Sequence, residues 1–370
     1  TSFMLETNIY LFDGTLTAIY GHRNLDVDSW AEVGAGLIEF RFGNLLEQKQ
    51  DSLELRWSGE LSDNITLTTG AFFFDQFYDY DEERYIGGST HYIRGGEMDH
   101  SSQALFAQID YTMSDDLTLT VGGRYGTEKK IAKVFIANTG ACDAVDYETP
   151  GDHSSCDAPK AGNDWTNFSP KLGVRYQLND DDIVYATWSK GFRSGGYNFR
   201  HTDPDSSAEY DEESLSAFEL GYKATLIDGQ LLFNAAIFKN TVDNMQATSN
   251  RALPSGDILA VVANEAKVNL TGIEVSGFFA ITDDLGLDFS YGYTDHDYEK
   301  WPAEEKKINN GTGQVDYLRD LVLPMAPKSQ GYIALVSTQE IGLGLLTFNG
   351  SYSYNGKTFG DQPNSNPIDS

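Results

Sequence analysis

The chain has 370 residues, a formal net charge of −30 and 13% aromatic residues. The acidic balance argues against a nucleic-acid-binding protein, because phosphate backbones are bound by Lys and Arg. No run of about 18 apolar residues occurs, which excludes a transmembrane helix but not membrane-spanning strands, since these alternate in polarity. The length allows two ordinary domains or one large β architecture.

Short clusters rich in Asp, Asn and Gly recur along the chain between strand-like segments. Such clusters are typical of hairpin turns. Successive clusters are roughly 50 to 65 residues apart. Seven turns with two strands each predict 14 antiparallel strands. The turns lie at 13–14, 62–64, 114–116, 179–182, 228–229, 282–284 and 339–342.

Longer polar segments alternate strictly with these turns. A soluble β-sandwich has no reason to gather its long loops at one end, whereas outer-membrane barrels have short periplasmic turns and long outer loops. We therefore expect an all-β, antiparallel transmembrane β-barrel wall with long extracellular loops. The longer segments lie at about 21–50, 80–99, 136–163, 195–212, 245–258 and 295–326.

The segments between turns alternate apolar and polar residues, as the stretch 164–200 illustrates with two such runs around an acidic turn. They run about ten residues, the length that a tilted strand needs to cross hydrocarbon. Their polar faces carry both signs of charge, as Arg56, Glu219 and Glu274 show. A hydrated lumen suits these charges better than a packed core, where burial costs several kcal/mol per ion. A sandwich with its polar side outward shows the same alternation and is the alternative.

The apolar faces define the side that we expect to contact lipid. Aromatic residues near the turns would then form a belt at the membrane interface, although strand propensity also explains them. The belt would include Phe12, Tyr111, Tyr176 and Tyr291. The side chains expected to point outward are Leu105, Ile109, Leu119, Val121, Phe218, Tyr222 and Phe289.

Two cysteines, Cys142 and Cys156, share one polar segment that contains Gly, Pro and Asp. Nothing around them has metal-ligand spacing. We predict a disulfide that closes this loop, which would imply an oxidising compartment. Two free thiols in a cytosolic loop are the alternative.

We expect no catalytic, metal or cofactor site. The histidines lack a spacing such as H-E-x-x-H, and the adjacent 99–101 triplet Asp-His-Ser does not by itself make a triad. The glycines at 191, 195 and 196 precede no predicted helix, so we expect a strand-to-loop bend and not a phosphate loop. The acidic aromatic segment 77–85 could bind Ca²⁺ that bridges to lipopolysaccharide, but a solvated loop is the simpler interpretation.

Several ordered blocks resemble the barrel of a TonB-dependent outer-membrane receptor. In the fourth and fifth blocks, the family's Glu-x-Gly-x-Lys strand and Asp-Gly turn precede a strand with Asn, Gly and Glu, here Asn264, Gly272 and Glu274. Each block alone is weak, but their order and spacing are specific, and together they cover most of the chain. The blocks are 52–74, 99–130, 169–198, 210–246 and 262–295.

The resemblance implies a barrel of roughly 22 strands around an N-terminal plug. On that count, residues 1–370 form part of the barrel, and the plug, the TonB box and the closing C-terminal strands are not visible. It also implies active uptake of a scarce, bulky nutrient, most often a ferric siderophore or another iron chelate, across the outer membrane of a Gram-negative bacterium.

The implied partners are the TonB–ExbB–ExbD complex, lipopolysaccharide and a small chelate ligand. The resemblance leaves cobalamin, haem and oligosaccharides open as cargo. A passive porin or a secreted soluble β-protein are the other classes that the strand pattern allows.

Overall fold

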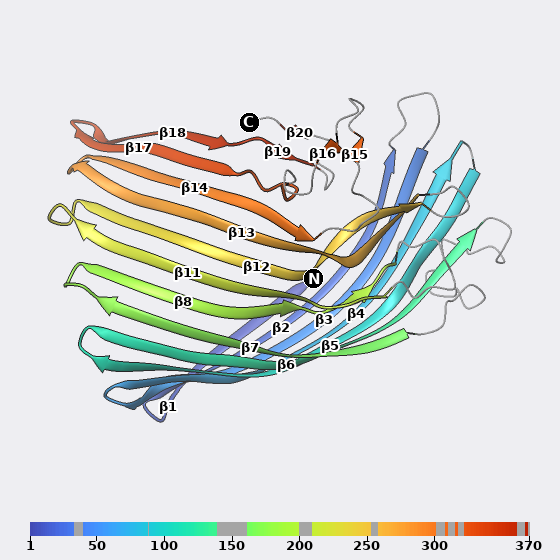
Figure 1. Ribbon diagram of the computed structural model, residues 1–370, viewed down its shortest axis with the longest axis horizontal. Helices are drawn as coiled ribbons and strands as arrows, with labels where there is room; N and C mark the ends of the chain where they lie inside the picture. Colours follow the sequence, from blue (N-terminus) through green and yellow to red (C-terminus); the bar gives the residue numbers. More distant parts are fainter. Residues whose placement is uncertain are drawn as a thin grey trace.

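A computed structural model of the chain describes residues 1–32, 40–87, 89–138, 161–199, 209–252, 258–300, 308–309, 315–316, 322–360 and 367–368. These residues form one 14-stranded antiparallel sheet, which curves as a barrel wall (Figure 1). Its strands follow the chain order, and β1 and β18 are its two edges. Among the described residues, no helix is long and apolar enough to cross a membrane.

The strands of the sheet are β1 (Ser2–Leu11), β2 (Gly14–Glu32), β3 (Phe40–Ser62), β4 (Ile65–Ile86), β5 (Ser89–Ser114), β6 (Leu117–Asn138), β7 (Ala161–Gln177), β8 (Asp182–Arg193), β11 (Glu213–Leu226), β12 (Leu231–Ala252), β13 (Ile258–Thr282), β14 (Leu285–Lys300), β17 (Ser329–Ile341) and β18 (Gly344–Asn355). Three two-stranded ribbons accompany it: β9 (Gly196–Tyr197) with β10 (Glu209–Tyr210), β15 (Ile308–Asn309) with β16 (Val315–Asp316), and β19 (Thr358–Phe359) with β20 (Pro367–Ile368).

The seven predicted hairpin turns all occur, and they lie at one end of the sheet, at the left of Figure 1. The turn between β1 and β2 illustrates how these residues form a tight hairpin. Leu11 pairs with Gly14, and the two residues between them have φ of 53° and 54°. Two left-handed residues make a type I′ turn, whose twist matches that of the flanking strands. The predicted strand count is therefore confirmed. The alternation of short and long connections is not strict, because only residues 87 and 88 separate β4 from β5.

The strands are longer than the ten residues predicted. β5 has 26 residues and β3 has 23. The segments 21–50 and 80–99, expected to be loops, are mostly continuations of strands, and β2 pairs with β3 as far as Glu32 and Arg41. We expect a membrane-spanning strand to leave hydrocarbon after about ten residues, and water on both faces then no longer requires apolar/polar alternation although the backbone ladder continues.

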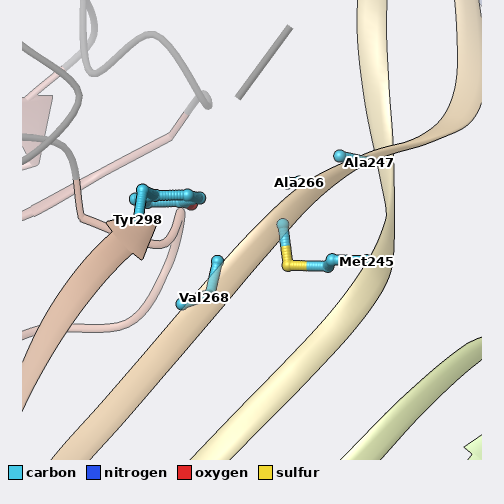
Figure 2. Packing of buried hydrophobic residues seen from close by; sticks show 5 residues of the cluster. All are labelled: Met245, Ala247, Ala266, Val268 and Tyr298. Carbon is cyan, nitrogen blue, oxygen red and sulfur yellow. The ribbon is translucent and has the colours of Figure 1, made fainter. Parts of the chain in front are cut away.

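The two faces of the sheet differ as expected. None of the seven side chains predicted to point outward is buried, and Leu105 and Val121 are 65% and 58% exposed. Small buried clusters lie instead near the end with the long connections. One of them joins β12, β13 and β14 (Figure 2), and it consists of Met245, Ala247, Ala266, Val268 and Tyr298.

Candidate ligand-binding face

The polar side of the sheet, here called the inner face, is a continuous surface across many strands. The pairing register of the strands makes this surface continuous, because residues paired across neighbouring strands point to the same side of the sheet. One row runs from Tyr185 through Gly221 and Ala236 to Glu274, and then to Gly292. This row and its neighbours line a hollow of 690 Å³.

Residues from the family-like blocks meet in this hollow. Glu219 accepts a hydrogen bond of 2.7 Å from the Tyr185 hydroxyl, and the Lys223 ammonium lies 5.7 Å from the centre of the same ring. Glu274 comes from β13 and lines the hollow with them. Charges of both signs on one face require water or polar partners, so this face suits a hydrated lumen.

The connection between β8 and β11 folds back across the inner face. We call its described ends, residues 194–199 and 209–212, the clasp. Ser194 Oγ donates to Glu128 Oε2 at 2.5 Å, and Lys130 Nζ donates to the Gly195 carbonyl at 2.7 Å. A Cβ atom on Gly195 would collide with the Tyr210 carbonyl and the Trp165 ring. This glycine is therefore needed for close packing at a strand-to-loop bend, as predicted.

The second end of the clasp is anchored equally well. Trp165 Nε1 donates to Asp211 Oδ1 at 2.9 Å. Asn264 accepts from the Asp211 N–H at 2.6 Å and donates to its carbonyl at 2.8 Å. Gln246 Nε2 joins the two ends, because it donates to the carbonyls of Ser194 and Asp211 at 2.9 and 3.0 Å. Both ends of the clasp are thus fixed to the wall by hydrogen bonds.

Glu128 is the centre of the first anchor. His100 Nε2 lies 3.2 Å from the oxygen that Ser194 also contacts. These hydrogen bonds, with that from His100 the larger effect, hold the pKa of Glu128 below its usual value although burial raises it. Burial lowers the pKa of the neighbouring Lys130.

The contacts of Glu128 are not those of a catalytic triad. A triad needs the histidine between serine and acid, whereas Glu128 lies between Ser194 and His100. Asp99 and Ser101 are on the opposite face of β5 from His100, because adjacent residues of a strand alternate. The residues that the structure describes include no group of three or more His, Cys, Asp and Glu that could hold a metal ion.

The acidic aromatic segment 77–85 belongs to β4 and is not a loop. Tyr78 and Tyr80 lie on the inner face with ring centres 6.2 Å apart and nearly parallel, and Phe199 of the clasp lies 5.7 Å from Tyr78. The three rings form an aromatic patch near the long connections. Alternation places Asp79 and Asp81 on the other face.

Most side chains that anchor the clasp have no local signal in the sequence. This holds for Trp165, Gln246 and Glu128, whereas Asn264 belongs to a block that resembles the receptor family. The composition of the bend, Ser-Gly-Gly-Tyr-Asn at 194–198, was the one local signal. Cys142 and Cys156 lie outside the described residues, so the predicted disulfide stays a prediction.

The comparisons with known proteins agree on one family. A family model described as TonB dependent receptor-like, beta-barrel matches residues 3–370. The ferric-pyoverdine BN7/BN8 receptor of Pseudomonas putida is 25% identical over 51% of this chain and 21% of its own length. The metal-pseudopaline receptor CntO of Pseudomonas aeruginosa is 30% identical over 36% of this chain and 17% of its own.

Solved structures share the fold. The ferric yersiniabactin uptake receptor FyuA from Yersinia pestis matches with a TM-score of 0.78 and 14% identity, over 99% of this chain and 51% of that one. The siderophore receptor PiuA from Acinetobacter baumannii gives 0.71 and 15%, over 100% and 56%. The chain thus spans about half the length of these structures. The protein is a receptor-type β-barrel wall, and it belongs to the TonB-dependent receptor family.

Proposed function

We propose that this chain is the barrel wall of a receptor that takes up a ferric siderophore or another iron chelate across the outer membrane of a Gram-negative bacterium. The observation that carries the proposal is the aromatic patch and clasp on a hydrated inner face, at the end with the long connections. The names of the relatives support the cargo class, since they bind ferric pyoverdine and metal pseudopaline.

The proposal includes parts that lie outside this chain. An N-terminal plug would cover the inner face, and further strands would pair with the edges β1 and β18, because unpaired strand edges are costly in lipid. The TonB–ExbB–ExbD complex would drive transport through the plug, and lipopolysaccharide would surround the outer end of the wall. We also propose that the protein has no enzymatic activity.

The test uses the full-length receptor in its own cell. Radioactive iron is supplied under iron limitation as ferric pyoverdine, ferric citrate or a ferric hydroxamate chelate, and uptake is compared among wild type, receptor deletion and tonB deletion. We expect uptake of at least one chelate to disappear in both deletions and to return when the receptor gene is restored. Uptake that needs the receptor but not TonB would indicate a passive porin. Growth that depends on the receptor only with cobalamin, haem or an oligosaccharide would contradict the iron cargo.

A further inference from the structure

A short strap, Val322–Lys328, precedes β17 and lies against the inner face beside β14. Backbone hydrogen bonds hold it at two places: the Met325 N–H donates to the Phe359 carbonyl at 2.8 Å, and the Thr294 N–H donates to the Lys328 carbonyl at 2.8 Å. A third bond uses a side chain. The Leu323 N–H donates to Nδ1 of His296 at 3.1 Å. The strap is therefore held partly by a group that titrates near neutral pH.

His296 is deeply buried, with 3% of its surface exposed. Because Nδ1 accepts a hydrogen bond, a neutral ring carries its proton on Nε2. That nitrogen is buried and makes no hydrogen bond to any residue that the structure describes. The Leu323 side chain packs against the cluster of Met245, Val268 and Tyr298 shown in Figure 2. Docking of the strap thus fixes the ring in one neutral form.

The surroundings oppose a positive charge on this ring. Burial is the largest cause that lowers the pKa of His296, the Lys328 ammonium lowers it further, and Asp295 partly opposes both. Lys328 Nζ is itself held 2.7 Å from Asp295 Oδ1. On this face, β13 pairs Leu270 with His296 and β12 pairs Asn240 with Leu270, and neither residue is charged. Tyr298, two residues further along β14, is also titratable, but burial raises the pKa of its hydroxyl, so it stays neutral. A second proton would also have to enter at Nδ1, whose lone pair the Leu323 N–H occupies.

We propose that His296 and the strap form a pH-sensitive latch, in which the neutral ring holds the strap on the inner face and protonation releases it. The released state has an ordinary histidine that binds a proton near the usual pKa of 6.5. The docked state binds fewer protons, so acid favours release. The equilibrium constant for docking of the strap has its full value above that pH, and it falls by up to about tenfold for each pH unit below it.

Hydrogen exchange of the full chain, read by mass spectrometry on peptides covering 322–328 between pH 5 and 8, tests the latch. After correction for intrinsic exchange rates, we expect protection of the strap to fall as pH drops below about 6.5. His296→Asn should keep an acceptor near Nδ1 but cannot be protonated, so protection should become independent of pH. His22→Asn is the matched control, because His22 binds Asp51 on another part of the wall and should leave the dependence unchanged.

A second variant keeps the test decisive if His296→Asn does not fold. Lys328→Gln removes a nearby positive charge that lowers the pKa of the docked ring, so the docked state should tolerate a proton better and release should move to lower pH. Strap protection that does not vary with pH in the wild type overturns the latch. So does an unchanged pH dependence in His296→Asn, or a release pH that Lys328→Gln does not lower.

Discussion

Individual side chains on the inner face make contacts that the adjacent residues of the same strand do not make, because adjacent residues point to opposite faces. Tyr78 stacks on Tyr80 and contacts Phe199 of the clasp, while Phe77 points to the opposite face of β4. Glu128 accepts hydrogen bonds from two directions and fixes one root of the clasp. Both residues lie beyond the part of their strands that hydrocarbon needs, where aqueous ligands have access.

The aromatic patch predicts a contribution to chelate binding. Tyr78→Ala in the complete receptor should weaken binding of the transported ferric chelate about fivefold, since a lost aromatic contact costs about 1 kcal/mol. Titration of the chelate by intrinsic fluorescence quenching measures this. Phe77→Ala is the matched control and should leave Kd unchanged, because its ring is on the other face. Equal Kd values for the two variants would rule out the patch as a contact.

Glu128 predicts how the clasp responds to acid. Its pKa is lowered in the folded protein, so its contribution is complete above the usual value of 4.5 and is lost as pH falls through the folded value. Exchange protection of peptides covering 194–199 should therefore decrease below about pH 4.5, whereas Glu128→Gln should be less protected at neutral pH and show a weaker pH dependence. Glu60→Gln, beside a distant turn, should behave as wild type. A clasp equally protected in all three proteins would contradict this role.

At the scale of the elements, the backbone of the hairpin turn between β11 and β12 is strained at one residue. The turn between β11 and β12 places Ile227, Asp228 and Gly229 at φ of 56°, 52° and 88°. Asp and Gly tolerate the left-handed region, but a β-branched residue does not. Ile227 is also 56% exposed, so little packing offsets this strain.

Ile227→Asn should therefore stabilise the protein by about 0.5–1 kcal/mol, because asparagine accepts the left-handed conformation more readily. Urea unfolding of the protein in a lipid or detergent environment measures the change. Leu343→Asn is the matched control: Leu343 is an apolar turn residue, 98% exposed, that has no positive φ. A loss of stability in Ile227→Asn, or an equal gain in the control, would show that strain at this turn is not relieved.

For the whole molecule, the central property is a wall with one apolar face, which we expect to contact hydrocarbon, and one polar face, which we expect to contact water. Ile109 is 44% exposed on the apolar face, and the adjacent Gln108 contacts Asp110 and Lys171 on the inner face. Ile109 lies within the last ten residues of β5, where we expect the strand to cross hydrocarbon. Ile109→Arg should cost about 2–4 kcal/mol of unfolding free energy in lipid, the cost of Arg on a lipid-facing site near mid-bilayer. Gln108→Arg, at the same depth, should cost less. Equal costs at the two positions would mean that the faces do not differ in solvent.

Much of this architecture was predictable. The two-residue period of a strand and the chemistry of a turn are local, so alternation in segments such as 104–113 and 117–125 identified strands and their faces, and the turns gave the number of strands, fourteen. The great length of the four strands from β2 to β5 was not predictable, because the apolar/polar alternation of side chains ends where both faces are expected to be in water. The long segments therefore looked like loops although their backbones stay paired.

The candidate site depended on contacts that only the folded chain makes. Ser194 is 66 residues from Glu128, Trp165 is 46 from Asp211, and the strap reaches His296 across 27. No local pattern encodes such pairs, since hydrogen bonds between distant residues depend on which strands become neighbours and how the connections fold back. The sequence by itself determined a β wall with an apolar and a polar face. Only the tertiary structure decided where the clasp and the strap attach to the inner face. Their hydrogen bonds join residues far apart in the chain, and spacing along the sequence does not reveal which of these residues become neighbours.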